Sequence, residues 1–196
     1  MHTQLTVLLR QRLKAGQRAL CVIDGFCGAG KTTLAAQLSG LFSGAPVIHM
    51  DDFFLPDHLR TPERLAAPGG NVHHERFAEE VIAGLEAGGG FAYRRFDCAT
   101  GRLVDRFCPD APLIIVEGSY SLHPALQPAW QRLGAITVFL EVEEGEQLRR
   151  IARRAPEKLD AFVKRWIPLE KNYFQAYDIR EWAQLRLVSP SREEQV

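Results

Sequence analysis

One glycine-rich segment of this sequence has the residue types and spacing that bind phosphate. Residues 25–32, called the phosphate loop below, read GFCGAGKT and match G-x-x-x-x-G-K-[ST], between an apolar run and a predicted helix. Glycines let successive main-chain N–H groups point at one anion, and the helix N-terminus adds its dipole. We expect Lys31 to reach the outer phosphates of a nucleoside triphosphate and the Thr32 hydroxyl to coordinate Mg²⁺; a chance match is the alternative. The residues expected to contact the nucleotide are Gly25, Gly28, Ala29, Gly30, Lys31, Thr32 and Thr33.

Two further apolar runs end in carboxylates. Asp51 and Asp52 follow the run 47–50, and Glu117 follows the run 113–116. Phosphoryl transfer to an alcohol needs a metal and a base near the acceptor hydroxyl, and carboxylates can serve as both ligand and base. Adjacent side chains of an extended chain face opposite ways, so only one of the two aspartates is expected to enter a site. The alternatives are an aspartate pair that caps a loop and a solvated glutamate at a strand end.

The hydrophobic pattern supplies the elements that would position these residues. Strands alternate with helices, which indicates an α/β fold: a three-layer sandwich with a mostly parallel sheet covered on both faces. Ligands gather at the carboxyl ends of such strands, where the phosphate loop and the three acids lie. Strands are predicted at 19–24, 47–50, 91–96, 113–116, 136–142 and 185–188, and helices at 3–15, 31–42, 75–87, 145–154 and 157–177. Residues 55–74 are predicted to be irregular, 97–112 a loop or extended connection, and Trp166 and Tyr173 core residues.

Length, charge and cysteine usage narrow the class of protein. The chain of 196 residues predicts a single domain spanning 1–196. Lys and Arg number 24, equal to Asp and Glu, so no net field attracts nucleic acid or an anionic membrane, and a small-molecule partner is favoured. The four cysteines lack CxxC spacing, and no signal peptide or spanning segment is found, so a reduced, cytoplasmic location is expected. Whether the chain forms a homo-oligomer is left open.

The three motifs together resemble those of one kinase family. The segment 24–33, HMDDFF at 49–54 and VEGSY at 116–120 are similar in order and spacing to the uridine kinase and phosphoribulokinase-like kinases. The resemblance implies a P-loop NTPase-type fold with a short helical lid, ATP as the phosphoryl donor, and Mg²⁺. It further implies that Asp51 is the catalytic base, with a link to the metal, and that Glu117 is the carboxylate on the metal side.

The segment at about 148–160 resembles the lid of these kinases, a helix whose arginines reach the triphosphate. Arg150 and Arg154 match that pattern best, and as i,i+4 neighbours they share one helix face. With Lys31 and Asp51 they complete the predicted catalytic set. The alternative is a solvated charged face on which the arginines pair with the glutamates just before them.

The segments expected to bind the acceptor depart from the uridine kinase pattern. The stretch 71–77 has His73 where an aspartate is expected, and the residues CATGR that follow Asp97 at 98–102 contain no histidine. Because nucleoside recognition depends on a few placed hydrogen bonds, the resemblance does not imply uridine as the acceptor. The candidate acceptor residues, for which an exposed loop position is the alternative, are Asp52, His73, Arg76, Tyr93, Arg95 and Arg102.

The sequence therefore predicts an ATP-dependent kinase that phosphorylates a hydroxyl of a small metabolite, such as a nucleoside, a sugar or a related alcohol. One alternative is a nucleotide-hydrolysing switch or regulatory module, although the motifs N-K-x-D and D-x-x-G do not occur. Another is a nucleoside monophosphate kinase, in which Arg76, Arg95 and Arg102 would hold the acceptor phosphate. Asp51 argues against this alternative, because a phosphate acceptor has little need of a carboxylate base.

Overall fold

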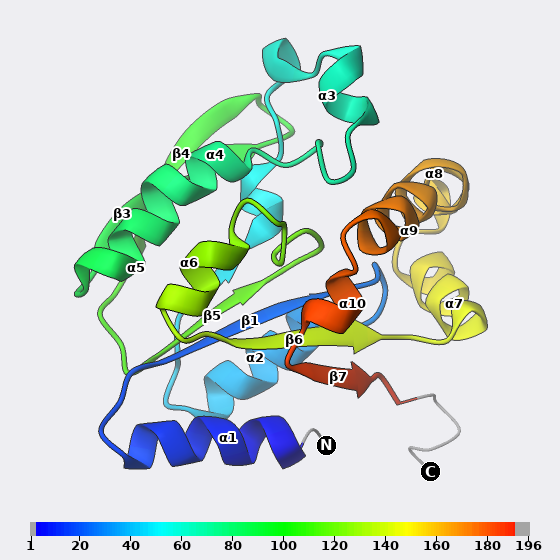
Figure 1. The fold of residues 1–196 in the computed structure, drawn as a ribbon. Coiled ribbons are helices and arrows are strands. Elements are labelled where there is room, and N and C mark those ends of the chain that lie inside the picture. Colours follow the sequence, from blue (N-terminus) through cyan, green and yellow to red (C-terminus); the bar gives the residue numbers. More distant parts are fainter. Residues whose placement is uncertain (1–2, 191–196) are drawn as a thin grey trace.

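A five-stranded parallel sheet forms the centre of the computed structural model, which describes residues 3–190 (Figure 1). Every strand pair in this sheet is parallel, and β1 at its middle is buried along its whole length. Buried parallel strands read as continuous apolar runs, which is why the pattern of the sequence located them. The strand order is β2 (Val47–His49), β5 (Leu113–Glu117), β1 (Ala19–Gly25), β6 (Ile136–Glu141) and β7 (Leu185–Val188).

Helices cover both faces of this sheet. Alternate residues of β1 divide between two cores: Cys21 and Ile23 pack on one side, Leu20 and Val22 on the other. The first core includes the helices α1 (Thr3–Lys14) and α2 (Lys31–Leu41), and the second includes α6 (Gln127–Arg132), α9 (Ile167–Ala176) and α10 (Ile179–Trp182). Figure 1 shows the sheet between these two layers. The predicted three-layer α/β fold with a parallel sheet is therefore confirmed.

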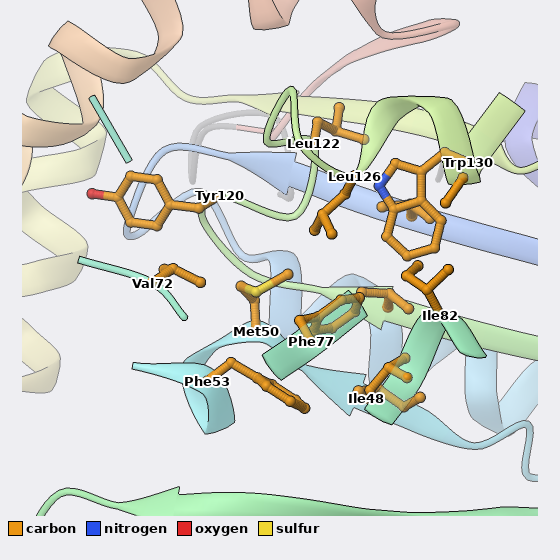
Figure 2. Close-up of a cluster of buried hydrophobic side chains, with 14 of the residues drawn as sticks. Ile48, Met50, Phe53, Val72, Phe77, Ile82, Tyr120, Leu122, Leu126 and Trp130 are labelled. Carbon is orange, nitrogen blue, oxygen red and sulfur yellow. The ribbon is translucent and has the colours of Figure 1, made fainter. Parts of the chain in front are cut away.

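A buried aromatic cluster fixes the turn that carries the two adjacent aspartates. Asp51 and Asp52 lie in a short 3₁₀ turn, η1 (Met50–Phe53), immediately after β2. The side chains of Met50 and Phe53, which bracket them, are fully buried. The ring of Phe53 packs edge-on against Phe77 at 4.8 Å between centroids, and both belong to the cluster in Figure 2. Burial of its two ends leaves the middle of the turn to project outward.

A two-stranded antiparallel hairpin stands apart from the main sheet in Figure 1. It comprises β3 (Phe91–Asp97) and β4 (Arg102–Cys108), and β3 follows a continuous helical segment made of α4 (His74–Phe77), a π turn η3 (Ala78–Ile82) and α5 (Ala83–Ala87). The strand at 91–96 and the helix at 75–87 were predicted. The prediction of a loop or extended connection at 97–112 is wrong for residues 102–108, which form β4. The side chain of Phe107 is 67% exposed, and only Cys108 of β4 is buried, so this strand lacks an apolar face that a pattern could reveal.

The C-terminal helices agree with the predicted ranges to within a few residues. The helices run through α7 (Glu144–Arg154), η4 (Pro156–Lys158), α8 (Leu159–Ala161), η5 (Phe162–Trp166) and α9. Tyr173 is fully buried as expected, whereas Trp166 is only half-buried. The short helices η2 (Asp57–Leu59), α3 (Pro62–Ala66), α6 and α10 were not predicted, because three to six residues carry too little periodicity. None of the helices within residues 3–190 combines the length and the apolar character that a membrane crossing requires.

Candidate active site

The phosphate loop connects β1 to α2 through three glycines with positive φ. Gly25, Gly28 and Gly30 have φ values of +142°, +75° and +95°. At Gly25 a Cβ atom would overlap the main-chain oxygen of Leu140 on the neighbouring strand β6. Other residues rarely adopt such φ values, so the glycines of the motif are required by the path of the backbone. The loop thereby brings its main chain to the carboxyl edge of the sheet.

Lys31 is buried and its ammonium group lies inside the phosphate loop. Its Nζ atom donates hydrogen bonds to the main-chain oxygens of Gly25 and Phe26, at 2.7 and 3.0 Å. A third bond runs to Ser119 Oγ, at 3.1 Å. These three acceptors satisfy the three donors of the ammonium group, and they hold its charge where an anion in the loop would lie.

Glu117 joins the end of β5 to the end of β2 and to the first turn of α2. Its Oε1 atom accepts a hydrogen bond from Thr32 Oγ1 at 3.1 Å and lies 2.5 Å from His49 Nδ1. The Glu117 side chain is buried, and its contact with His49 raises the pKa of that imidazole. The hydroxyl and the carboxylate that were predicted to share a metal are therefore adjacent. His49 was not predicted, because its role follows only from the pairing of β2 with β5.

Asp51 and Asp52 face different neighbours. The pKa of Asp51 is raised, first by desolvation from surrounding protein, and Lys31 is the main charge opposing that rise. The pKa of Asp52 is also raised by desolvation, and the charges opposing it are those of His49 and the hairpin arginines Arg95 and Arg106. The divergence expected of adjacent side chains is thus present: Asp51 lies on the side of the phosphate loop, and Asp52 on the side of the hairpin.

Two buried acids of the site were missed in the sequence. Asp24 accepts hydrogen bonds from the main-chain N–H groups of Gly25, Tyr120 and Leu122 and from the Tyr173 hydroxyl. Burial raises the pKa of Asp24 to about 6 in spite of these donors. The second acid, Glu170 of α9, accepts a hydrogen bond from the Cys27 main-chain N–H of the phosphate loop at 2.8 Å. Asp24 lies in the motif segment 24–33 but was given no role there, and Glu170 carries no motif and reaches the loop only through the fold.

The helix α7 packs against the phosphate loop and lines a cavity of about 510 Å³ beside it. Arg150 donates from its Nη1 atom to the main-chain oxygens of Gly28 and Ala29, both at 3.3 Å, while its Nε bonds Glu146 at 2.7 Å. Arg154 lines the same cavity. The two predicted lid arginines therefore line one cavity. Arg150 pairs with Glu146, as the alternative of a charged helix face predicted, and it also contacts the phosphate loop. The lining residues are Gly28, Ala29, Gly30, Thr33, Leu34, Gln37, Leu140, Glu146, Arg150, Arg153, Arg154, Ser189 and Pro190.

Most of the candidate acceptor residues gather around the turn η1, but they differ in how exposed they are and in which contacts they already make. Arg76 is 4% exposed, donates to the Asp52 main-chain oxygen at 3.0 Å and lies 4.3 Å above the Phe53 ring. Tyr93 is buried and stacked on Phe53 at 6.0 Å. Both therefore support the turn. His73 binds the turn only through its main chain, whose N–H donates to the Phe53 oxygen at 2.7 Å.

The two remaining candidates lie on the hairpin. Arg95 is half-buried on β3 and lies 3.7 Å from Asp97. Arg102 is exposed at the start of β4, directly opposite Asp97 in the strand pairing. Arg106, farther along β4, was not predicted, because the sequence pattern did not reveal that strand. The structure thus adds Arg106 to the basic residues on the hairpin side of the site, near Asp52.

In comparisons with known proteins, no family model and no curated protein matches this chain. Solved structures are similar. A possible uridine kinase from Bacillus stearothermophilus is 21% identical with a TM-score of 0.63, covering 94% of this chain and 100% of that one. Shikimate kinase from Acinetobacter baumannii in complex with shikimate is 18% identical with a TM-score of 0.47, covering 89% and 85%. Shikimate kinase from Bacteroides thetaiotaomicron is 20% identical with a TM-score of 0.43, covering 89% and 90%. At this level of identity, the likeness to the first structure establishes the fold alone: this chain has the α/β fold of the P-loop small-molecule kinases.

Proposed function

We propose that this chain is an ATP-dependent kinase that transfers the γ-phosphoryl group to a hydroxyl of a small metabolite. The observation that carries the proposal is the contact between Thr32 and Glu117, whose side chains are hydrogen-bonded at 3.1 Å at the mouth of the phosphate loop. This contact joins a loop suited to a triphosphate with an acid suited to its metal ion. The P-loop kinase-like fold supports the same activity.

ATP would lie with its phosphates along the main chain of the phosphate loop and its nucleoside in the adjoining cavity. Lys31 would exchange its carbonyl acceptors for the outer phosphate oxygens, which bind an ammonium group more strongly because they are charged. Arg150 and Arg154, which line the cavity, would add positive charge near the triphosphate. This arrangement would neutralise the transferred group without any large movement of the sheet.

The side chains of Thr32, Asp51 and Glu117 fit Mg²⁺. Hydroxyl and carboxylate oxygens are its preferred ligands, and the ion usually combines one or two carboxylates with phosphate and water oxygens. The Glu117 carboxylate supports this set, since its Oε1 already accepts from Thr32. Within residues 3–190, no three acidic, histidine or cysteine side chains are gathered closely enough to hold a metal unaided, so the proposed set depends on phosphate ligands. Bound Mg²⁺ would supply charge neutralisation.

Asp51 would orient the acceptor hydroxyl and take its proton. The hydroxyl oxygen would bond to the γ-phosphorus while the bond from that phosphorus to the bridging oxygen of ADP breaks. A carboxylate accepts a proton more readily as its pKa rises toward neutrality, and the pKa of Asp51 is raised by desolvation. Its neighbour Asp52 faces the hairpin and would contact the acceptor away from the reacting atoms.

The contacts of Arg76 weigh against the nucleoside monophosphate kinase alternative. That activity needs several free arginines around an acceptor phosphate. The Arg76 guanidinium is buried, bonded to the Asp52 main-chain oxygen and 3.5 Å from Glu80. It is therefore committed to the turn η1, which removes one of the three arginines that the alternative needs, and the Asp51 carboxylate favours a hydroxyl acceptor.

The test is ADP release from ATP and Mg²⁺ measured against nucleosides, sugars, sugar acids, pantothenate and vitamin alcohols, with each product confirmed by mass. We expect one acceptor class to stimulate ADP release strongly. The variant Asp51→Asn should lose turnover while it retains nucleotide binding, because the amide cannot take the proton. Lys31→Ala should weaken ATP binding as well as turnover.

A matched control for Asp51→Asn is Asp110→Asn. Asp110 is an exposed aspartate that precedes the amino end of β5, at the sheet edge opposite the phosphate loop. Its substitution changes the net charge equally and should leave turnover unchanged. Undiminished phosphorylation by Asp51→Asn would eliminate the proposed base. Slow ATP hydrolysis that no acceptor stimulates would instead favour the nucleotide-hydrolysing switch.

A further inference from the structure

The hairpin places three arginines on one face: Arg102 at its turn end, and Arg95 and Arg106 farther along. Directly opposite residues of an antiparallel pair share a face, and successive residues of a strand alternate between faces. Tyr93 lies opposite Arg106 and Arg95 lies opposite Val104, so Arg95 and Arg106 are on the face that carries Tyr93. They are diagonal neighbours across the two strands, close enough for long side chains to reach one ligand.

This face of the hairpin is turned toward the aspartate turn η1. The Tyr93 ring stacks on Phe53 at 6.0 Å, and the guanidinium of Arg76 connects the turn to β3 through the main-chain oxygens of Asp52 and Arg94. The charge of Arg95 interacts with the opposite charge of Asp52, as this geometry requires. The hairpin face therefore borders the side of the site where the acceptor would lie.

The hairpin arginines on this face are less neutralised than the one on the other face. Arg94, on the opposite face, is bonded to Glu80 through both its side chain and its main-chain N–H. Arg106 has no carboxylate within 4.0 Å among residues 3–190, and the Arg95–Asp97 pair is long at 3.7 Å. On the hairpin face that carries Tyr93, the single acid Asp97 is outnumbered by the arginines Arg95, Arg102 and Arg106.

Buried polar atoms without a hydrogen-bond partner lie in the same region. In the described part of the chain, the buried side-chain nitrogens and oxygens that lack a hydrogen-bond partner are His73 Nδ1, Arg76 Nε and Arg95 Nε. All three belong to the residues that surround the turn η1. Buried polar atoms are nearly always paired in folded proteins, so unpaired ones gathered at one place indicate a ligand or ordered water there. For a guanidinium N–H, an anionic oxygen is the strongest partner.

We infer that the acceptor carries an anionic group, a carboxylate or a phosphate, in addition to the hydroxyl that is phosphorylated, and that Arg95 and Arg106 bind this group. The inference rests on the proposed function, and it narrows the acceptor class. The hydroxyl would face Asp51, on the side of the phosphate loop, while the anionic group would lie past Asp52 against the hairpin. Neutral nucleosides and sugars lack such a group and would leave the arginines without a partner.

The test uses acceptors in pairs that share a skeleton and differ in charge. Glycerate is compared with glycerol, pantothenate with its alcohol, and glycerol 3-phosphate with glycerol, so the carboxylate and phosphate arms are separate. We expect kcat/KM to be roughly a hundred-fold higher for an anionic member than for its neutral partner, as charge-assisted hydrogen bonds allow. Efficient turnover of neutral members alone, or equal turnover of both, would overturn the inference and leave the kinase proposal standing. No acceptor-stimulated ADP release from the whole panel would overturn the kinase proposal, and the inference with it.

Substitutions of the hairpin arginines test where the anionic group of the acceptor binds. Arg106→Gln changes an exposed residue, so folding should persist, and KM for the anionic acceptor should rise roughly ten-fold while the neutral partner is unaffected. Arg95→Gln should act in the same direction, and Arg95→Lys should recover part of the loss. The control Arg94→Gln removes the same charge from the opposite face and should leave the anionic preference intact. Equal effects of Arg94→Gln and Arg106→Gln would overturn the assignment.

Discussion

The buried carboxylate of Glu170, on α9, accepts a hydrogen bond from the main-chain N–H of Cys27 at 2.8 Å, inside the phosphate loop. Its other oxygen accepts from Ser119 Oγ at 2.6 Å. Ser119 in turn accepts a hydrogen bond from Lys31, so one acid couples α9 to the loop, to the segment after β5 and to the loop lysine. A helix far along the chain thereby holds the conformation of the phosphate loop.

Glu170→Gln should destabilise the protein by about 1–2 kcal/mol, because an amide offers one acceptor oxygen in place of two charged ones. ATP binding should also weaken, since the loop loses a support. Urea unfolding and calorimetric titration with ATP measure the two effects. Lys171→Gln, at the next residue, removes only an exposed pair with Glu144 and should stay within about 0.5 kcal/mol of the parent. Equal stability of the two variants would argue against this role for Glu170.

Alanine at two glycines should have opposite effects on stability. Gly25 has a φ of +142°, and a Cβ atom there would overlap the Leu140 main-chain oxygen, so Gly25→Ala must separate β1 from β6. We expect a loss of at least about 3 kcal/mol. Gly40 lies in α2 with open space around its Cβ position, so Gly40→Ala should stabilise by about 0.5–1 kcal/mol. Chemical denaturation of both variants checks the prediction, and a loss of stability at Gly40 would contradict it.

Asp24→Asn should cost about 2–4 kcal/mol of unfolding free energy. Oδ1 of Asp24 accepts from the N–H groups of Gly25 and Tyr120, while Oδ2 accepts from the Leu122 N–H and the Tyr173 hydroxyl. An asparagine would place an NH₂ group against buried donors on one side.

A double-mutant cycle with Tyr173→Phe isolates one of these bonds. Tyr173→Phe alone removes a donor and should cost about 1 kcal/mol. In the Asp24→Asn background the same change should cost less, because the bond from Tyr173 is already impaired. Additive losses would show that Asp24 and Tyr173 are not coupled.

The main elements of the fold could be predicted because their signals are local. The run ALCVI before Asp24 and the run LIIV before Glu117 are apolar throughout, as strands buried on both faces are. In a parallel sheet the carboxyl ends of such strands meet at one edge, which is why Thr32 and Glu117 could be expected near each other. The assigned roles of the site residues remain predictions.

Residues whose position depends on long-range packing could not be predicted. Glu170 reaches Cys27 across 143 positions, and Tyr173 reaches Asp24 across 149, so no local spacing connects either pair. The strand β4 was missed for a different reason. Its residues are mostly exposed on both faces, which removes the alternation of apolar and polar residues that would mark a strand, and Arg106 was missed with it.

The buried imidazole of His123 should make the stability of the protein depend on pH. It is 7% exposed, stacked on His74 at 4.3 Å between ring centroids and parallel to Tyr173 at 6.1 Å. Burial, helped by the nearby charges of His74 and Arg64, lowers its pKa from 6.5 to about 4. Between pH 6.5 and 4 the unfolded chain therefore binds more protons at this position than the native protein does. Its contribution to stability is complete above about pH 6.5 and is lost as the pH falls toward 4.

His123→Phe keeps an aromatic ring in the stack and removes the titrating group. Between pH 7 and pH 5 the parent protein should lose about 2 kcal/mol more unfolding free energy than the variant, given 1.36 kcal/mol per pKa unit. Asp24, whose pKa is raised, acts in the opposite direction over part of this range, but both proteins retain it and its effect cancels in the difference. Urea unfolding at half-unit pH steps measures the two profiles. Parallel profiles would mean that the native His123 takes up a proton as readily as the unfolded chain does.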